Sequence, residues 1–191
     1  HLDPGLMASL AVPRQIGLDF DGVDDRVRVA DSPTLDVTAA ITVEAWIRPD
    51  SISNNKDQNR IISKSVDWEL TISTGDTGCG FGTAGHVQWR MSIGGVNARI
   101  CGGSLVTGEW QHLAGTYDGG RVALYVNGIA VSSAARSGAI TTNASQLVFG
   151  NYPTNSRPFD GRLDEVRIWN RALSQSEIQA RMTVDLTGIE P

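Results

Sequence analysis

The sequence predicts an all-β protein, a sandwich of two antiparallel sheets with one short helix near the C-terminus. Three observations support this fold class. Apolar and polar residues alternate with a period of two over many short segments, glycine-rich turns separate these segments, and only one segment carries helix signals. The chain has 191 residues, of which 40% are hydrophobic and 19% are charged, and it contains 21 glycines. This size and composition suit one domain with its own core.

The first half of the chain contains four alternating segments. Residues 41–48 and 66–73 each place apolar side chains on one face of a strand and mostly polar ones on the other. Residues 87–93 and 96–100 alternate in the same way on either side of Gly94-Gly95. Two glycines in succession suit the positive backbone angles of a two-residue hairpin turn. These segments therefore predict half-buried strands, the last two joined as a hairpin.

The second half repeats this pattern. Further strands are expected at residues 110–117, 121–126, 129–134, 146–150 and 162–170. Asn127-Gly128 is the strongest hairpin signal in the chain. One helix is expected to begin after Ser174, with Glu177 completing a capping box, and to end near Met182.

The ends and the net charge of the chain narrow the choice of partners. Residues 1–14 have the character of a tag remnant or linker, which leaves residues 15–191 as one expected domain. No signal peptide and no run of about 18 apolar residues are visible, so no membrane insertion is expected. The formal net charge is −5. An acidic surface repels phosphate backbones, which makes nucleic acid an unsuitable partner.

The two cysteines, Cys79 and Cys101, lie in glycine-rich turns that flank the 87–100 hairpin. They are too far apart in the sequence for the clustered ligands of a zinc site. We interpret them as one disulfide of an exported protein, with two free thiols as the alternative.

Four segments resemble one known family. Residues 18–27 read LDFDGVDDRV, residues 109–117 read EWQHLAGTY and continue to LYVNG, and residues 159–174 read FDGRLDEVRIWNRALS. Together with residues 41–49, these segments resemble the bacterial laminin-G-like domains of the concanavalin A-like lectin/glucanase superfamily. The resemblance spans about residues 16–182 and implies a jelly-roll sandwich. It also implies an extracellular or cell-surface setting in a multidomain protein, binding to glycans or proteins, and often a structural calcium ion.

An acidic turn follows the first segment of this resemblance. Asp21, Asp24 and Asp25 lie within five positions, and Gly22 allows a sharp bend. Calcium prefers six to eight oxygen ligands, which carboxylates and backbone carbonyls supply. The ends of a jelly roll meet, so Asp164 on the last strand is expected to face this turn and join the metal site. The alternative is an ordinary turn with solvated aspartates.

A candidate ligand surface comes from the polar faces of the middle strands. By alternation these side chains point away from the core, and we expect them to contact a glycan: Glu69, Gln88, Arg90, Asn97 and Arg99. Tyr152, in the loop of residues 151–157, is a further candidate. The alternative is an ordinary solvated face. The tryptophans are expected to be structural: Trp46, Trp68, Trp89, Trp110 and Trp169.

Catalysis is not expected. Asp67 and Glu69 are the nearest candidate carboxylate pair for glycoside hydrolysis, but no further carboxylate extends the pair. Nucleophile-elbow, zinc-helix and phosphate-loop motifs are missing. The sequence therefore predicts a non-catalytic, exported carbohydrate-binding module with a structural calcium ion. The alternatives are a protein-interaction or adhesion domain and, third, a polysaccharide hydrolase or lyase.

Overall fold

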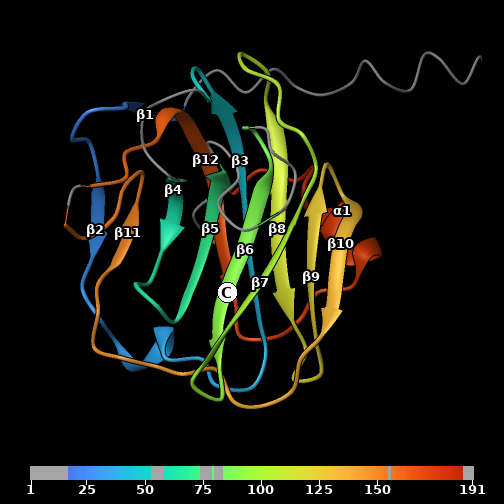
Figure 1. The fold of residues 1–191 in the computed structure, drawn as a ribbon. Coiled ribbons are helices and arrows are strands. Elements are labelled where there is room, and N and C mark those ends of the chain that lie inside the picture. Colours follow the sequence, from blue (N-terminus) through green and yellow to red (C-terminus); the bar gives the residue numbers. More distant parts are fainter. Residues whose placement is uncertain (1–16, 53–57, 74–78, 80–83, 155, 187–191) are drawn as a thin grey trace, which may run out of the picture.

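The computed structural model describes residues 17–52, 58–73, 79, 84–154 and 156–186. Within these ranges, two six-stranded antiparallel sheets pack face to face, as Figure 1 shows. This arrangement confirms the predicted jelly-roll sandwich. The proposed tag or linker at residues 1–14 lies outside the described residues.

Sheet A is the rear layer in Figure 1 and sheet B the front layer. In spatial order, sheet A contains β1 (Leu18–Asp21), β12 (Asp160–Trp169), β3 (Ile41–Pro49), β8 (Gln111–Tyr117), β9 (Arg121–Val126) and β10 (Ile129–Ala135). Sheet B contains β2 (Val27–Val29), β11 (Leu147–Phe149), β4 (Gln58–Ser63), β5 (Trp68–Ser73), β6 (Val87–Ile93) and β7 (Val96–Gly102). A short 3₁₀ turn, η2 (Pro33–Leu35), and one helix, α1 (Gln175–Arg181), complete the described structure.

The hydrophobic core lies between the two sheets and follows the predicted alternation. Trp68 and Trp89 of sheet B are each 1% exposed, with ring centroids 6.5 Å apart. The Trp89 indole donates a hydrogen bond to the carbonyl oxygen of Thr116 in sheet A, at 3.2 Å. This bond and the apolar faces of both sheets fix how the layers pack.

Two parts of the strand assignment differ from the sequence prediction. Val66 is 56% exposed, because β5 begins only at Trp68 and Ser65 has a positive φ of 53° in the preceding turn. The strands β2 and β4 were not predicted. β2 has three residues and β4 reads QNRIIS, so neither shows the alternation of a half-buried strand.

The C-terminal segment covers part of the outer face of sheet A. The capping box is confirmed: the Ser174 side chain accepts from the Glu177 amide, and the Glu177 side chain accepts from the Ser174 amide. Ile178 of α1 packs with Leu173 and Trp169. The Trp46 indole donates to the carbonyl oxygen of Met182 at 2.9 Å. Trp46 and Trp169 are therefore packing residues, as expected.

Trp110 is half-buried and its ring lies beside Gly17. Within the described part of the chain, no helix is long and apolar enough to span a membrane.

Candidate functional site

The outer face of sheet B carries the candidate ligand-binding residues. The strand register places Glu69, Arg90 and Arg99 directly opposite one another on β5, β6 and β7. A small pocket of about 90 Å³ opens on this face. Its lining residues are Arg60, Val66, Glu69, Arg90, Met91, Asn97 and Tyr152. The structure thus brings four of the six predicted ligand residues to one pocket: Glu69, Arg90, Asn97 and Tyr152.

Glu69 is the charged centre of the pocket. Its Oε1 lies 3.1 Å from the Nε of Arg60, and its Oε2 lies 3.1 Å from a terminal nitrogen of Arg90. The Ser63 hydroxyl donates to Oε1 as well, at 3.2 Å. The Arg60 and Glu69 side chains are each 6% exposed, whereas the Arg90 side chain is 28% exposed. Arg90 is therefore the member of this group that meets solvent.

Tyr152 reaches the pocket from the loop after β11. Its ring lies over the Arg60 guanidinium, with 5.3 Å between the guanidinium carbon and the ring centroid. The buried Asn151 side chain shapes this loop, because its Oδ1 accepts hydrogen bonds from the amides of Tyr152 and Arg157. The Arg60 amide in turn donates to the carbonyl oxygen of Arg157. Tyr152 is thus held above sheet B by the backbone.

Arg60 and Asn151 are site residues that the sequence reasoning missed. Arg60 lies in β4, which has no alternating pattern, so its side chain could not be assigned to the polar face. Burial lowers the pKa of Arg60 to about 10, with the charges of Arg90 and Arg157 acting in the same direction and that of Glu69 opposing them. The Arg60 guanidinium therefore lies in a crowded, poorly solvated environment.

The expectation of an open polar face is wrong at two of the predicted positions. Glu69 is 5% exposed, and Gln88 is fully buried. Gln88 points away from the core but is covered, so a ligand cannot touch it in this structure. Asn97 and Arg99, nearer the sheet edge, are exposed.

The predicted pairing of Cys79 with Cys101 is present as a disulfide with Cα atoms 5.8 Å apart. Cys101 lies opposite Gln88 on β7, so its side chain is on the outer face of sheet B. The disulfide consequently fixes Cys79 to the same face that carries the pocket.

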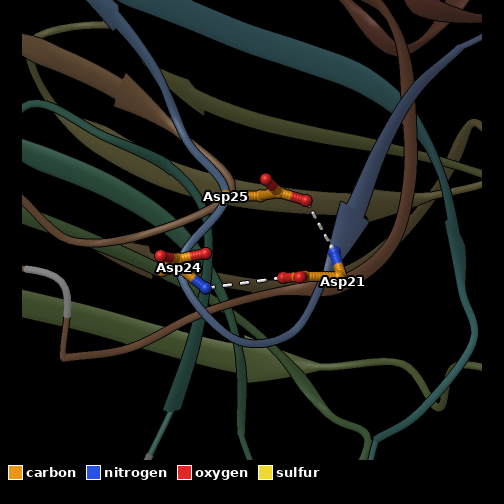
Figure 2. Close-up of side chains that lie close together, drawn as sticks. All are labelled: Asp21, Asp24 and Asp25. Carbon is orange, nitrogen blue, oxygen red and sulfur yellow. Dashed lines mark hydrogen bonds between the residues drawn. The ribbon is translucent and has the colours of Figure 1, made fainter.

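The acidic turn between β1 and β2 gathers the three predicted carboxylates. One oxygen from each of Asp21, Asp24 and Asp25 lies within 4.8 Å of the others, and all three residues are exposed. Figure 2 shows that Asp21 accepts a hydrogen bond from the Asp24 amide, while Asp25 accepts one from the Asp21 amide. Two oxygens that share a calcium ion at about 2.4 Å lie at most about 4.8 Å apart. The donor set and its spacing therefore fit a hard cation.

The prediction that Asp164 joins this turn is wrong. In the β1–β12 pairing, Asp160 lies opposite Asp21, whereas Asp164 lies four residues further along β12 and opposite Trp46 of β3. Burial, followed by the charges of Asp50, Asp21 and Asp19, raises the pKa of Asp160. Asp160 is thus the residue of the last strand that adds negative charge at this corner.

The candidate catalytic carboxylates are both held by cations. Asp67 is 1% exposed, and its oxygens contact the Lys64 ammonium and the side chain and amide of Asn143. Glu69 is held by Arg60 and Arg90, as described above. A substrate has no access to Asp67, so the two residues do not form the pair of reachable carboxyl groups that glycoside hydrolysis needs.

The fold is a jelly-roll sandwich of two antiparallel six-stranded sheets. The profile of the concanavalin A-like lectin/glucanases superfamily named Laminin_G_3 matches residues 21–179. The chain belongs to this superfamily.

Relatives in sequence are much longer proteins. Mouse pappalysin-1 is 25% identical over 186 residues, which cover 89% of this chain and 11% of pappalysin-1. Human usherin is 24% identical over 164 residues, which cover 81% of this chain and 3% of usherin. The chain therefore spans only a small part of each relative.

Solved structures show the same fold. One is a protein of Bacteroides ovatus that is assigned to carbohydrate binding. It has a TM-score of 0.70 at 23% identity, and the match covers 91% of this chain and 50% of that one. Domain 4 of AbnA, an extracellular GH43 arabinanase of Geobacillus stearothermophilus solved with arabinotriose, has a TM-score of 0.58 at 23% identity, over 81% and 71%. The binding domain of botulinum neurotoxin DC, solved with rat synaptotagmin II, has a TM-score of 0.58 at 13% identity, over 81% and 38%. At these identities the likeness concerns the fold alone.

Proposed function

We propose that this chain is a non-catalytic carbohydrate-binding module of an exported multidomain protein. The observation that carries the proposal is the pocket on the outer face of sheet B. It presents Glu69, Arg90 and Asn97 beside the half-buried ring of Tyr152. Charged and amide groups can hydrogen-bond sugar hydroxyls, and an aromatic ring can pack against a pyranose face.

Three findings support the setting of the proposal. Disulfides such as Cys79–Cys101 persist mainly in oxidising compartments, including the cell exterior. Two structural neighbours are a protein assigned to carbohydrate binding and a domain of an extracellular arabinanase bound to arabinotriose. The small share of pappalysin-1 and usherin that this chain spans fits a module within a longer protein.

We also propose that the acidic turn binds a structural calcium ion through Asp21, Asp24 and Asp25. The supporting observation is the cluster of three exposed carboxylates within 4.8 Å. When bound, the ion supplies positive charge that offsets these carboxylates. Asp21 keeps the turn in shape by accepting hydrogen bonds from the amides of Val23 and Asp24.

A second candidate function is protein interaction or adhesion through the same outer face. The observation that favours it is the structural neighbour bound to rat synaptotagmin II.

A glycan array separates these functions. We expect selective binding to one class of glycan. The variants Asn97→Ala and Tyr152→Ala should each weaken this binding. The matched control is Thr154→Ala, an exposed change in the same loop as Tyr152. Binding to no glycan in either calcium or chelator contradicts the proposal and favours the protein-interaction function. Release of reducing ends or unsaturated products from a bound polysaccharide contradicts the non-catalytic assignment.

A further inference from the structure

The floor of the pocket on sheet B consists of charged groups that are already engaged within the protein. Glu69 is held by Arg60 on one side and by Arg90 on the other, each at 3.1 Å. Both arginines make a further interaction besides the one with this carboxylate. The side chains of Arg60 and Glu69 are each only 6% exposed. The floor therefore gives a charged ligand little to bind.

Two polar side chains at the pocket wall are uncommitted. The Asn97 side-chain amide makes no hydrogen bond to any described residue, and neither does the Tyr152 hydroxyl. Asn97 is exposed and Tyr152 is half-buried, so a ligand can reach both. A primary amide can donate two hydrogen bonds and accept others, and a phenol hydroxyl can donate one and accept others. These two side chains are therefore the polar groups that the pocket offers to a ligand.

The two uncommitted groups line the pocket from opposite sides. In sheet B the spatial order of the strands is β11, β4, β5, β6 and β7. Tyr152 follows β11, and its ring centroid lies 5.3 Å from the guanidinium carbon of Arg60 in β4. Asn97 lies in β7, three strands beyond β4, which corresponds to roughly 14 Å between the two backbones. Glu69 and Arg90 lie between them on β5 and β6.

An apolar side chain completes the wall of the pocket. Val66 lines the same pocket and is 56% exposed. A single exposed valine is ordinary on a protein surface. Here it lies in the same pocket as the two uncommitted polar groups, so the pocket combines a hydrogen-bond donor, an acceptor and an aliphatic surface.

We propose that this pocket binds the acetamido group of an N-acetylated amino sugar. This inference rests on the proposed carbohydrate-binding function. A planar trans amide points its N–H and its carbonyl oxygen in opposite directions, which suits partners on opposite walls. Asn97 donates to the carbonyl oxygen, the Tyr152 hydroxyl accepts from the N–H, and Val66 contacts the methyl group. The acetamido group is neutral, as a floor of paired charges requires.

A hydroxyl at the same position of the sugar fits this pocket less well. A hydroxyl is too short to reach both polar walls, and it has no methyl group to place against Val66. The acetamido group therefore gains one hydrogen bond and one apolar contact over the hydroxyl. This difference gives the pocket a preference between two neutral sugars that are otherwise identical.

The test compares neutral sugars that differ only in the substituent at C2, by isothermal titration calorimetry. Triacetylchitotriose is paired with cellotriose, and the methyl glycosides of N-acetylgalactosamine and N-acetylmannosamine are paired with those of galactose and mannose. We expect the acetamido member of at least one pair to bind about tenfold or more tightly than its partner. Because the acetamido group is uncharged, this preference should be the same at about 0.05 M and about 0.5 M salt.

Three variants locate the acetamido group. Asn97→Ala removes the donor, Tyr152→Phe removes only the hydroxyl, and Val66→Ser removes the aliphatic contact. Each should lower the preference for the acetamido sugar about threefold or more. The preference is a ratio of two affinities, so a variant that merely lowers the fraction of folded protein leaves it unchanged.

The matched controls make the same chemical changes outside the pocket. Asn170→Ala changes an exposed asparagine that follows β12, and Val106→Ser changes a valine that is 49% exposed. Neither residue lines the pocket. Both variants should keep the preference within about twofold of that of the unaltered protein.

The outcomes separate this inference from the proposed function. Tighter binding of an acetamido sugar that the three pocket variants reduce and the two controls leave unchanged supports the inference. Equal binding of both members of every pair, or a preference that the pocket variants leave unchanged, overturns the inference and leaves the carbohydrate-binding function standing. Binding of none of these sugars and of no glycan on the array overturns both.

Discussion

A buried polar group on the outer face of sheet A shows how single residues stabilise this fold. Glu44 and His112 are both fully buried beneath the C-terminal segment. Glu44 accepts a hydrogen bond from the Trp169 indole at 2.9 Å, and its other oxygen lies 3.5 Å from the His112 Nε2. Burial opposes the charge on Glu44, but His112, Trp169 and Arg167 together outweigh it, so the pKa of Glu44 lies below its usual value.

The stability of the protein should therefore depend on the charge of Glu44. Because its folded-state pKa is lowered, its contribution is present above the usual value of 4.5 and is lost as pH falls through the folded-state pKa. We expect Glu44→Gln to lower the free energy of unfolding at pH 7 by about 1–3 kcal/mol. Urea denaturation at pH 7 and at about pH 3.5 should show this difference shrinking at acid pH. Glu109→Gln, at an exposed position, is the control. A pH-independent difference contradicts the role of the charge.

The burial of charged residues could not be predicted from the sequence. Lys64 is fully buried, and its ammonium contacts Asp31, Asp36 and Asp67 at 2.9–3.2 Å. Asp67 lies in the same turn as Lys64. Asp31 and Asp36 flank η2, and only the tertiary structure brings them to Lys64. Gln88 was assigned correctly to the outer face, but alternation says nothing about what covers that face.

At the level of strands, alternation predicted most of the sandwich. The hairpin β6–β7 has the expected register around Gly94 and Gly95, both with positive φ. β4 escaped prediction because it is interrupted by a register shift between Arg60 and Ile62 and lacks a period of two. Since Arg60 lies there, the missed strand also removed a residue from the predicted site.

Substitutions at two glycines are expected to lower stability for different reasons, one through side-chain packing and the other through backbone conformation. A Cβ on Gly115 of β8 would lie 2.7 Å from Cε3 of the buried Trp89, whereas one on Gly95 would meet no atom within 4 Å. We expect Gly115→Ala to cost about 1–3 kcal/mol through overpacking. Gly95→Ala should cost about 1–2 kcal/mol through its φ of 76° alone.

Tryptophan fluorescence during denaturation distinguishes the two variants, because only Gly115→Ala should change the native emission that Trp89 contributes. An unchanged native spectrum in Gly115→Ala would show that the Trp89 ring does not pack against this position as described.

For the whole molecule, the acidic turn is the first of the connections through which the described chain passes from one sheet to the other. β1 ends at Asp21 in sheet A, and β2 begins at Val27 in sheet B, which Figure 1 shows at the same edge of the sandwich. The sequence was sufficient to predict the turn and its three aspartates. It was insufficient to choose between Asp160 and Asp164, because that choice depends on the register between β1 and β12.

A calcium ion at this turn would bind at the link between both sheets, so its effect should appear in global unfolding. At a calcium concentration about 100 times the dissociation constant, binding adds about 2.7 kcal/mol, which raises Tm by roughly 5–10 °C in a domain of this size. We expect chelator to reverse the rise in Tm, measured by differential scanning calorimetry, and Asp21→Asn to abolish it.

Asn keeps an oxygen that can accept the amide hydrogen bonds of Val23 and Asp24, so the turn itself should persist in the Asp21→Asn variant. Asp19→Asn removes an exposed carboxylate of the same strand that lies outside the cluster, and it should retain the calcium response. Identical melting of the unaltered protein in calcium and in chelator would leave the turn as a solvated link whose aspartates act only through their hydrogen bonds.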